Sequence, residues 1–292
     1  MRTGGSPQRG KNKPENRTGR PLNQSLARKY ERLKNELKAA GSVLVAFSGG
    51  VDSSLLLRVA ADVLKDQVLA VTVDTPLFSR QEMRAAQKLA KGLQVGLMIV
   101  KANSLELPAV AKNSNQRCYY CKLFLFSGLK QIAKNKGLNQ IVEGSNLDDT
   151  KDFRPGKKAI KELGIRSPLE EAGFSKNEIR QLAKYLGLPN WNKPEAACLA
   201  SRIPYGQPLD RKLLSKIERG ERALISLGFS QVRLRHHGEI ARIEINLEDF
   251  SRWLKPEIRT RAVSSLKKLG YRYVVLDLEG YRTGSLNPLA VK

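Results

Sequence analysis

Short apolar runs alternate with amphipathic segments along most of the chain. The run at residues 43–47 is apolar throughout, which is typical of a strand that is buried on both faces. The segment before it, residues 26–40, repeats its apolar residues at helical spacing and stops at Gly41, so it predicts a helix. The same reasoning predicts further strands over residues 67–74, 95–100 and 140–143, and helices over residues 55–64, 79–92, 118–136 and 175–186.

The order of these elements predicts the fold class. Strands that alternate with helices favour an α/β fold, in which a parallel sheet is covered by helices on both faces and ligands bind at the carboxyl ends of the strands. Beyond Gly206 the order changes to helix (210–227), strand (231–236), strand (240–245), helix (256–269) and strand (273–278), which predicts a small α+β domain with an antiparallel sheet. We therefore expect a flexible basic tail over residues 1–24, an α/β domain over residues 25–205 and the smaller domain over residues 206–292.

Composition narrows the class of protein. The chain has 292 residues, 41% hydrophobic residues and a formal net charge of +24, which suits about two globular domains and excludes a disordered chain. No apolar run approaches the roughly 18 residues that a membrane span needs, and the N-terminus lacks the apolar core of a secretory signal, so we expect a cytoplasmic protein. The positive charge favours anionic partners such as nucleotides, phosphorylated metabolites or RNA, although solubility alone would also explain it.

The most specific motif lies between the first predicted strand and the helix at residues 55–64. It reads Ser48-Gly49-Gly50-Val51-Asp52-Ser53-Ser54. Two glycines let the backbone amides approach an anion closely, and the following helix directs its N-terminal amides and positive dipole end to the same place. The serine hydroxyls add donors, and Asp52 is suited to hold a Mg²⁺ ion that bridges phosphates. The motif is not a Walker A loop, because it contains no lysine.

This heptapeptide resembles the pyrophosphate loop (PP-loop) of the N-type ATP pyrophosphatase superfamily. The resemblance implies that ATP is split between its α and β phosphates and that AMP is attached to an oxygen of the substrate. It also implies that the next strand, at Thr72, borders the adenine of ATP. The alternative is an ordinary buried strand that contacts no ligand, since such a strand has the same kind of sequence.

Three cysteines are too few and too odd in number for a disulfide scaffold. Cys118 and Cys121 form a C-x-x-C pair, and Cys198 lies further along the chain. Their thiolates, or a sulfide that they hold, are the obvious nucleophiles to displace AMP, and the alternative is that they are small buried side chains. Three thiolates suit a [4Fe–4S] cluster with one open iron. Zinc requires a fourth ligand, and the neighbours His236 and His237 point to opposite faces of a strand.

Further segments resemble the LarE family of ATP-dependent sulfur transferases, over about residues 26–285. They are residues 143–149, 152–156, 166–169 and 232–238, and the most specific one is Lys193-Pro194-Glu195-Ala196-Ala197-Cys198-Leu199-Ala200-Ser201-Arg202. The resemblance implies adenylation of a carboxylate of pyridinium-3,5-biscarboxylic acid mononucleotide and installation of sulfur, on the way to the nickel-pincer nucleotide cofactor of lactate racemase. It also implies a homo-oligomer, by analogy a hexamer, which the smaller domain helps to form.

Members of this family differ in their source of sulfur. In one version the cysteine that matches Cys198 gives up its own sulfur and becomes dehydroalanine, so that each chain turns over once. The presence of Cys118 and Cys121 resembles instead the cluster-bearing members, in which a [4Fe–4S] centre holds the transferable sulfide. We therefore expect Cys118, Cys121 and Cys198 to ligate a cluster together.

Arginine and serine side chains near these motifs are candidate binding residues for the phosphate or carboxylate of the substrate. They are Arg154, Ser201, Arg202, Arg233 and Arg235. An arginine fork binds either anion through two parallel hydrogen bonds. Arg233 and Arg235 alternate along one strand and share a face, which predicts either an anion site or an ordinary solvated face. Asp148 and Asp149 fit either a role in orienting Mg²⁺ or ordinary turn chemistry.

Other functions stay open on the sequence. A PP-loop tRNA thiolase also combines this loop with cysteine-bound clusters and would suit the positive charge, but no zinc-knuckle cysteines and no RNA-binding module are recognisable. An ammonia-using ligase with the same loop would leave the cysteines unexplained. A non-enzymatic ATP-binding regulator or metal-insertion chaperone would bind the nucleotide without releasing pyrophosphate.

Overall fold

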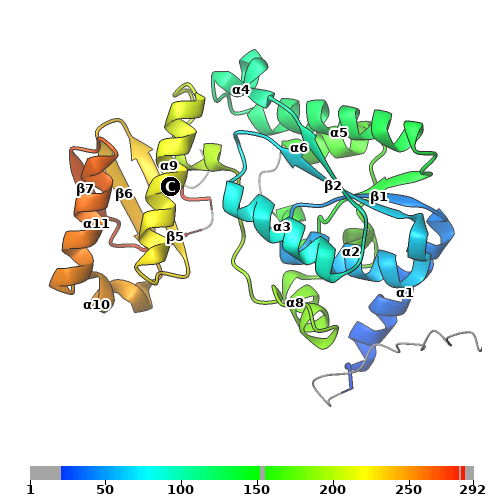
Figure 1. Cartoon of the computed structure of the whole chain (residues 1–292). Coiled ribbons are helices and arrows are strands. Elements are labelled where there is room, and N and C mark those ends of the chain that lie inside the picture. Colours follow the sequence, from blue (N-terminus) through cyan, green and yellow to red (C-terminus); the bar gives the residue numbers. More distant parts are fainter. Residues whose placement is uncertain (1–20, 152–154, 283, 287–292) are drawn as a thin grey trace, which may run out of the picture.

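The computed structural model describes residues 21–151, 155–282 and 284–286 (Figure 1). Most of the tail predicted over residues 1–24 therefore lies outside the described residues, as does Arg154. The first helix begins at Gln24, where the side chain of Asn23 caps it by accepting a hydrogen bond from the amide of Leu26 at 2.8 Å.

A parallel sheet forms the centre of the N-terminal part of the chain. It consists of β1 (Val43–Ala46), β2 (Val68–Asp74), β3 (Leu97–Lys101) and β4 (Gln140–Val142), in the order β3-β2-β1-β4. Each neighbouring pair of these strands is parallel, and the register places Val43 beside both Val68 and Gln140. The α/β fold class that the sequence predicts is confirmed.

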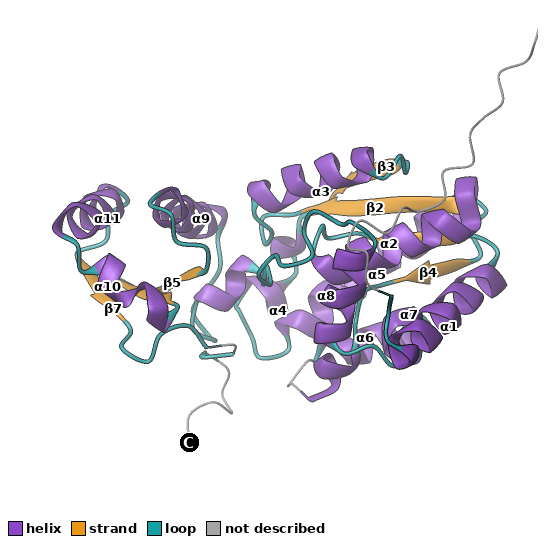
Figure 2. Cartoon of the chain, turned by 90° about the horizontal axis from the view of Figure 1, so that it is seen from below, coloured by secondary structure: helices purple, strands orange, loops and turns teal. Residues whose placement is uncertain are grey.

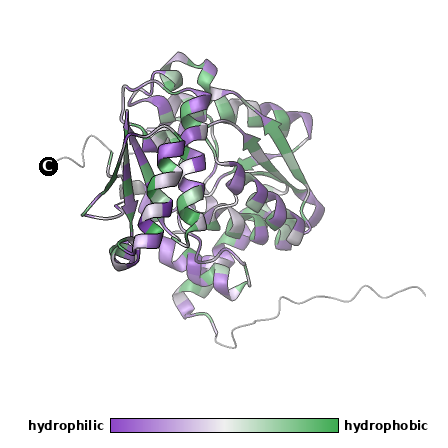
Figure 3. Cartoon of the chain, turned by 60° about the vertical axis from the view of Figure 1, so that its left-hand side comes forward, coloured by the Kyte–Doolittle hydropathy of each residue, from purple (hydrophilic) through white to green (hydrophobic). Residues whose placement is uncertain are grey.

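Helices cover both faces of this sheet (Figure 1). One face is covered by α1 (Gln24–Ala40), α2 (Val51–Leu64), α3 (Arg80–Gly92) and α8 (Lys176–Tyr185), and the other by α5 (Arg117–Asn135) and α6 (Gly156–Glu162). Alternate residues of a strand point to opposite faces, so Val43 and Val45 pack against the first group of helices and Leu44 against the second. Figure 3 shows these strands as hydrophobic, as expected for a sheet that is covered twice.

The C-terminal region, residues 206–286, contains a second and smaller sheet. Its strands are β5 (Val232–His237), β6 (Ile240–Ile245) and β7 (Tyr273–Leu276), in the order β5-β6-β7. The helices α9 (Arg211–Ser226) and α11 (Pro256–Lys268) lie side by side on one face of this sheet (Figure 2). The element order therefore follows the sequence prediction.

The prediction of an antiparallel sheet is wrong for β7. β5 and β6 pair antiparallel, whereas β6 and β7 pair parallel, with Ile240 opposite Tyr273. The reason is the connection: α11 crosses over between the two strands, and the chain returns to the end of the sheet at which β6 begins. The second sheet is therefore mixed.

Several short elements were not predicted, because they are shorter than the stretch in which a helical period can be read. They are α4 (Pro108–Ala111), α7 (Pro168–Glu171), α10 (Phe250–Trp253) and the 3₁₀ turns η1 (Lys65–Gln67), η2 (Ser104–Glu106), η3 (Leu147–Lys151), η4 (Leu199–Arg202) and η5 (Leu247–Asp249). Within the described ranges, no helix is long and apolar enough to cross a membrane.

The apolar core of the C-terminal region reaches back into the preceding part of the chain. Leu77, Val110, Leu199 and Ile203 belong to the same buried cluster as the strands β5 and β6. The boundary between two domains near residue 205 stays a prediction. What the packing establishes is that the second sheet shares its core with residues from before that point.

Candidate active site

The predicted phosphate loop lies at the carboxyl end of β1 and leads directly into α2. Gly49 has a φ of +74°, and a Cβ atom there would lie 2.9 Å from the Cβ of Ala86 on α3. Only glycine fits both the backbone conformation and the space. Val51 is buried and is the first residue of α2, so it fixes the start of the helix in the core.

The serine hydroxyls of the loop hold its shape from inside. Ser48 Oγ lies 3.0 Å from Ser53 Oγ, and the hydroxyl of Ser54 donates to the carbonyl of Gly50 at 2.7 Å. Among the described residues, no side chain caps α2 at Gly50. The amides of the first turn and the positive end of the helix dipole are therefore directed at an open position that suits an anion.

The carboxylate of Asp52 is the centre of a network of charged groups. Lys176 Nζ lies 2.6 Å from Asp52 Oδ2 and 3.0 Å from Glu195 Oε1, and the amide nitrogen of the Asn146 side chain donates to Asp52 Oδ1 at 3.3 Å. Burial raises the pKa of Asp52, and the Lys176 ammonium opposes that shift. An acidic group held between a lysine and an amide beside a phosphate loop is well placed to hold Mg²⁺.

Lys176 was not among the predicted site residues. It is the first residue of α8, which begins with a capping box formed by Ser175 and Glu178, and its backbone amide donates to Asp148 Oδ2 at 2.8 Å. Burial lowers the pKa of Lys176, but the carboxylates of Asp52 and Glu195 outweigh burial, so the net pKa is raised. Lys176 is therefore protonated and positively charged at neutral pH, beside the phosphate loop.

The turn after β4 packs against the same end of α2. A Cβ atom on Gly144 would lie 2.9 Å from the backbone nitrogen of Ser53, so any larger residue would push the turn away from the phosphate loop. Asp149 Oδ2 accepts from the amide of Asn146 at 3.0 Å and so fixes the residue that contacts Asp52. Asp149 thus has a turn-stabilising contact.

A third segment reaches the loop from beyond α8. The side-chain amide of Asn190 donates to the carbonyl of Gly49 at 3.2 Å and lies 3.0 Å from Ser54 Oγ. Lys193 pairs with Glu82 on α3, and its ammonium is 3.5 Å from the carbonyl of Gly49. Neither residue was predicted, because both contacts join positions that are far apart in sequence.

Thr72 is buried in β2, and its hydroxyl donates to the carbonyl of Phe47 at 2.7 Å. This contact ties β2 to the end of β1, immediately before the phosphate loop. A role for Thr72 beside the adenine stays a prediction.

The three cysteines lie near one another. Cys118 and Cys121 lie in the first turns of α5, and Cys198 is the residue before η4. Cys121 and Cys198 pack against the same apolar cluster. Burial, together with the neighbouring Cys198, raises the pKa of Cys121 to about 12, and burial also raises the pKa of Cys198. On their own, both are thiols at neutral pH.

The donor chemistry of this cluster of thiols fits an iron–sulfur cluster, since three sulfur ligands lie in one region. Within the described residues, however, no three cysteine, histidine or acidic side chains are close enough to hold a metal ion as they stand.

Arg117 adds a buried positive charge beside the thiols. Its guanidinium donates to Asn113 Oδ1 and stacks on the ring of Tyr205 at 4.4 Å. Its charge favours the thiolate of Cys198, which partly opposes the effect of burial on the pKa of that thiol. Sequence reasoning missed this residue, although it directly precedes the C-x-x-C pair.

Arginines of the predicted binding set hold the backbone around Cys198. Arg202 Nη1 donates to the carbonyls of Ala197 at 2.8 Å and of Cys198 at 3.1 Å, as well as to the hydroxyl of Ser201. Arg235 Nη1 donates to the carbonyl of Ser201 at 2.8 Å, and Arg233 Nη2 donates to the carbonyl of Glu195. These contacts position the segment that carries Cys198.

The charge of two of these arginines is compensated inside the protein. Arg202 Nε lies 2.9 Å from Glu221 Oε1, and Arg235 Nη2 lies 2.7 Å from Glu244 Oε2, with all four side chains almost fully buried. Arg233 is buried too, and its guanidinium lies 5.2 Å from the ring centre of Tyr281. The interpretation of Arg233 and Arg235 as an ordinary solvated face is therefore wrong. An anion-binding role stays a prediction. Among Arg202, Arg233 and Arg235, Arg233 is the one for which the described ion pairs include no carboxylate.

His236 has a structural role. His236 is buried, and its Nδ1 lies 3.2 Å from the hydroxyl of Tyr271. Burial lowers the pKa of His236 to about 4, with a smaller effect from Lys216, so the ring is neutral. It packs at the second sheet and belongs to neither the phosphate loop nor the thiol cluster.

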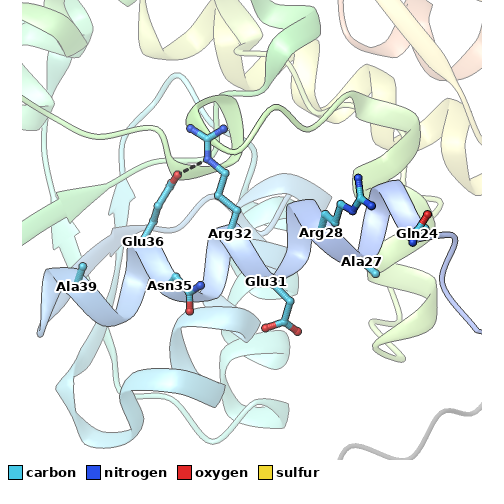
Figure 4. Close-up of a pocket in the computed structure, with 8 residues that line it drawn as sticks. All are labelled: Gln24, Ala27, Arg28, Glu31, Arg32, Asn35, Glu36 and Ala39. Atoms are coloured by element: carbon cyan, nitrogen blue, oxygen red, sulfur yellow. Dashed lines mark hydrogen bonds and ion pairs between the residues drawn. The ribbon is translucent and has the colours of Figure 1, made fainter.

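A groove on the outer face of α1 lies apart from all of these residues (Figure 4). Arg32 Nε donates to Glu36 Oε1 at 2.9 Å along it. In the described part of the chain, none of the predicted site residues lines this groove. The candidate active site is therefore the phosphate loop together with the thiol cluster.

Comparisons with known proteins identify the domain that carries the phosphate loop. A family model of the PP-loop domain matches residues 22–152. The chain is similar to the pyridinium-3,5-bisthiocarboxylic acid mononucleotide synthase of Lactiplantibacillus plantarum, with 40% identity over 92% of this chain and 97% of the relative. It is also similar to an uncharacterized protein of Synechocystis sp., with 39% identity over 91% of this chain and 100% of the relative. A further uncharacterized protein, from Methanocaldococcus jannaschii, is 29% identical over 88% of this chain and 98% of the relative.

Identity at this level over nearly the full length of both chains, with an intact phosphate loop, decides the family. The chain belongs to the LarE family of PP-loop proteins, the family of the Lactiplantibacillus plantarum pyridinium-3,5-bisthiocarboxylic acid mononucleotide synthase.

Proposed function

We propose that the protein is an ATP-dependent sulfur-inserting enzyme of nickel-pincer nucleotide cofactor biosynthesis. Its substrate is pyridinium-3,5-biscarboxylic acid mononucleotide, of which one carboxylate is adenylated and then converted to a thiocarboxylate. One observation carries the proposal: in a chain similar over 92% of its length to a synthase of the bisthiocarboxylic acid mononucleotide, the segment that bears Cys198 also contacts the phosphate loop through Asn190 and Lys193.

In the first half-reaction the chain binds ATP and directs its cleavage. The amides at the start of α2 and the serine hydroxyls of the loop bind the β and γ phosphates, and Lys176 adds a positive charge. Asp52 and the neighbouring Asn146 would hold Mg²⁺, which would neutralise charge on the leaving pyrophosphate. A carboxylate oxygen of the substrate attacks the α phosphorus, the bond to the bridging oxygen breaks, and pyrophosphate leaves. Holding both reactants in one site supplies much of the rate.

In the second half-reaction a sulfur nucleophile attacks the acyl carbon, and AMP leaves with the electron pair of the bond that breaks. We propose that Cys118, Cys121 and Cys198 together hold a [4Fe–4S] cluster, which would supply a site for transferable sulfide. The three thiols, the buried Arg117 beside them and the arginines that hold the Cys198 backbone support this assignment. Sacrifice of the Cys198 sulfur is the alternative within the same family.

A measurement of iron separates these two sources of sulfur. After anaerobic reconstitution we expect about four iron atoms and a similar amount of acid-labile sulfide per chain, and we expect each of C118S, C121S and C198S to lose most of both. H237A is the matched control and should retain the iron. If wild-type protein holds no iron and mass spectrometry finds dehydroalanine at Cys198 after turnover, the cluster assignment is wrong.

Release of pyrophosphate from Mg·ATP tests the function itself. With anaerobic protein, pyridinium-3,5-biscarboxylic acid mononucleotide should stimulate pyrophosphate release and yield a product whose mass has increased by the exchange of oxygen for sulfur. Unmodified tRNA is the comparison substrate. Stimulation by tRNA alone would make the protein a tRNA thiolase, and nucleotide binding without pyrophosphate release under either condition would make it a regulator or chaperone.

A further inference from the structure

Residues 190–198 join the nucleotide site to the thiol cluster. This bridging segment lies between α8 and η4 and contains no helix or strand. At one end Asn190 and Lys193 contact the phosphate loop, and at the other end is Cys198. Residues 194–197 between them are exposed, so little packing fixes this stretch.

The bridging segment has two kinds of contact with the nucleotide site. Asn190 and Lys193 reach the carbonyl of Gly49, a backbone group whose position the buried start of α2 fixes. Glu195 instead reaches the ammonium of Lys176, at 3.0 Å, while the same ammonium lies 2.6 Å from Asp52. The Glu195 contact therefore depends on a cation that is shared with the carboxylate beside the phosphate loop.

Bound Mg·ATP would compete for that cation. The phosphates carry more negative charge than Glu195, and Lys176 has only one charge to share. Glu195 also binds the ammonium of Lys176 less firmly than Asp52 does. The side chain of Glu195 is 43% exposed, whereas those of Lys176 and Asp52 are 18% and 19% exposed. An exposed carboxylate close to incoming phosphates is also repelled by their negative charge.

We propose that the Lys176–Glu195 ion pair is a latch that nucleotide binding opens. Lys176 moves from Glu195 to the phosphates, and the Cys198 end of the bridging segment is released from the nucleotide site. It then stays attached to the C-terminal region through Arg202 and Arg233, which hold the carbonyls of Cys198 and Glu195. Glu195 is thus a positioning residue that ties the place of Cys198 to occupancy of the phosphate loop. The inference rests on the proposed binding of ATP at this loop.

The first test measures the competition directly, by calorimetric titration of the full chain with Mg²⁺ and α,β-methylene-ATP. E195Q removes the competing charge and keeps the shape of the side chain, so it should bind the nucleotide about twofold to fivefold more tightly than wild type. E239Q is the matched control, because Glu239 forms a surface pair with Arg272 at 3.7 Å in the C-terminal region, in which both side chains are 68% exposed. Its affinity should equal that of wild type.

The second test follows Cys198, using the alkylation rate of each cysteine by iodoacetamide in the iron-free full chain, resolved by peptide mass. In wild type and in E239Q, the nucleotide should raise the rate at Cys198 severalfold relative to Cys118, which lies on α5. In E195Q the rate at Cys198 should be high already and should not respond to the nucleotide. A glutamate with a merely structural role would not produce this loss of response.

The two tests separate the latch from the function on which it rests. Wild-type protein that binds the nucleotide, but shows no change at Cys198 and no gain of affinity in E195Q, overturns the latch and leaves the proposed function standing. Wild-type protein that does not bind the nucleotide overturns both.

Discussion

Replacement of Asp52 by alanine should lower pyrophosphate formation by about a hundredfold to a thousandfold. Asp52 is the acidic residue in the first turn of α2, and Lys176 and Asn146 hold both of its oxygens in place. Without it the leaving pyrophosphate loses the group that would hold Mg²⁺, and Lys176 loses the partner that orients it. The iron content should stay the same, because Asp52 does not contact the thiol cluster.

The control for this variant is D62N. Asp62 lies on the same helix and forms an ordinary ion pair with Arg58 at 2.9 Å, so its loss should change pyrophosphate formation little. The measurement is the initial rate of pyrophosphate release with saturating substrate, together with iron analysis of each variant. Pyrophosphate release by D52A at the wild-type rate would contradict the role that we assign to this carboxylate.

Replacement of Arg202 by methionine should destabilise the protein by about 3–5 kcal/mol. The substitution leaves Glu221 buried without its cation, and that carboxylate also accepts a hydrogen bond from the amide of Leu234 at 3.1 Å, so it cannot easily turn to solvent. The carbonyls of Ala197 and Cys198 lose their donor at the same time. Sulfur insertion should therefore fall further than pyrophosphate formation does.

Urea unfolding, followed by circular dichroism, measures the loss of stability. R272M is the matched control, because Arg272 and its partner Glu239 are each 68% exposed and their pair should contribute little. The double variant R202M/E221Q should recover part of the loss, since it removes the uncompensated charge. Equal unfolding midpoints for R202M and R272M would show that the buried pair does not stabilise the fold.

The sequence predicts the long helices and strands well, but it predicts the direction of β7 in its sheet poorly. Strands such as β1 are apolar at every position because both faces are covered, and that pattern can be read without a structure. The direction of β7 depends instead on where α11 returns the chain, and local pattern holds no information about that. The prediction of an antiparallel sheet failed for this reason.

The site residues differ in the same way: some can be recognised from a local sequence pattern, and others depend on contacts between distant parts of the chain. The phosphate loop is contiguous, so its chemistry could be read from seven neighbouring residues. Lys176 meets Asp52 across 124 positions, and for this part of the chain the sequence predicts only a helix over residues 175–186. Arg235 was placed correctly on a strand face, but whether that face meets solvent depended on Glu244 of β6, which pairs with Arg235 although the register sets it opposite Arg233.

The shared core described for the second sheet bears on how such a protein can evolve. Leu77, Val110, Leu199 and Ile203 bury surface that the C-terminal strands and helices would otherwise expose to water. Exchange of residues 206–286 for an unrelated module would expose an apolar surface on the nucleotide-binding part. The excised piece would expose the complementary apolar surface. Recombination at that point is therefore disfavoured, and the two sheets are expected to be inherited together and to diversify by paired substitutions across their common core.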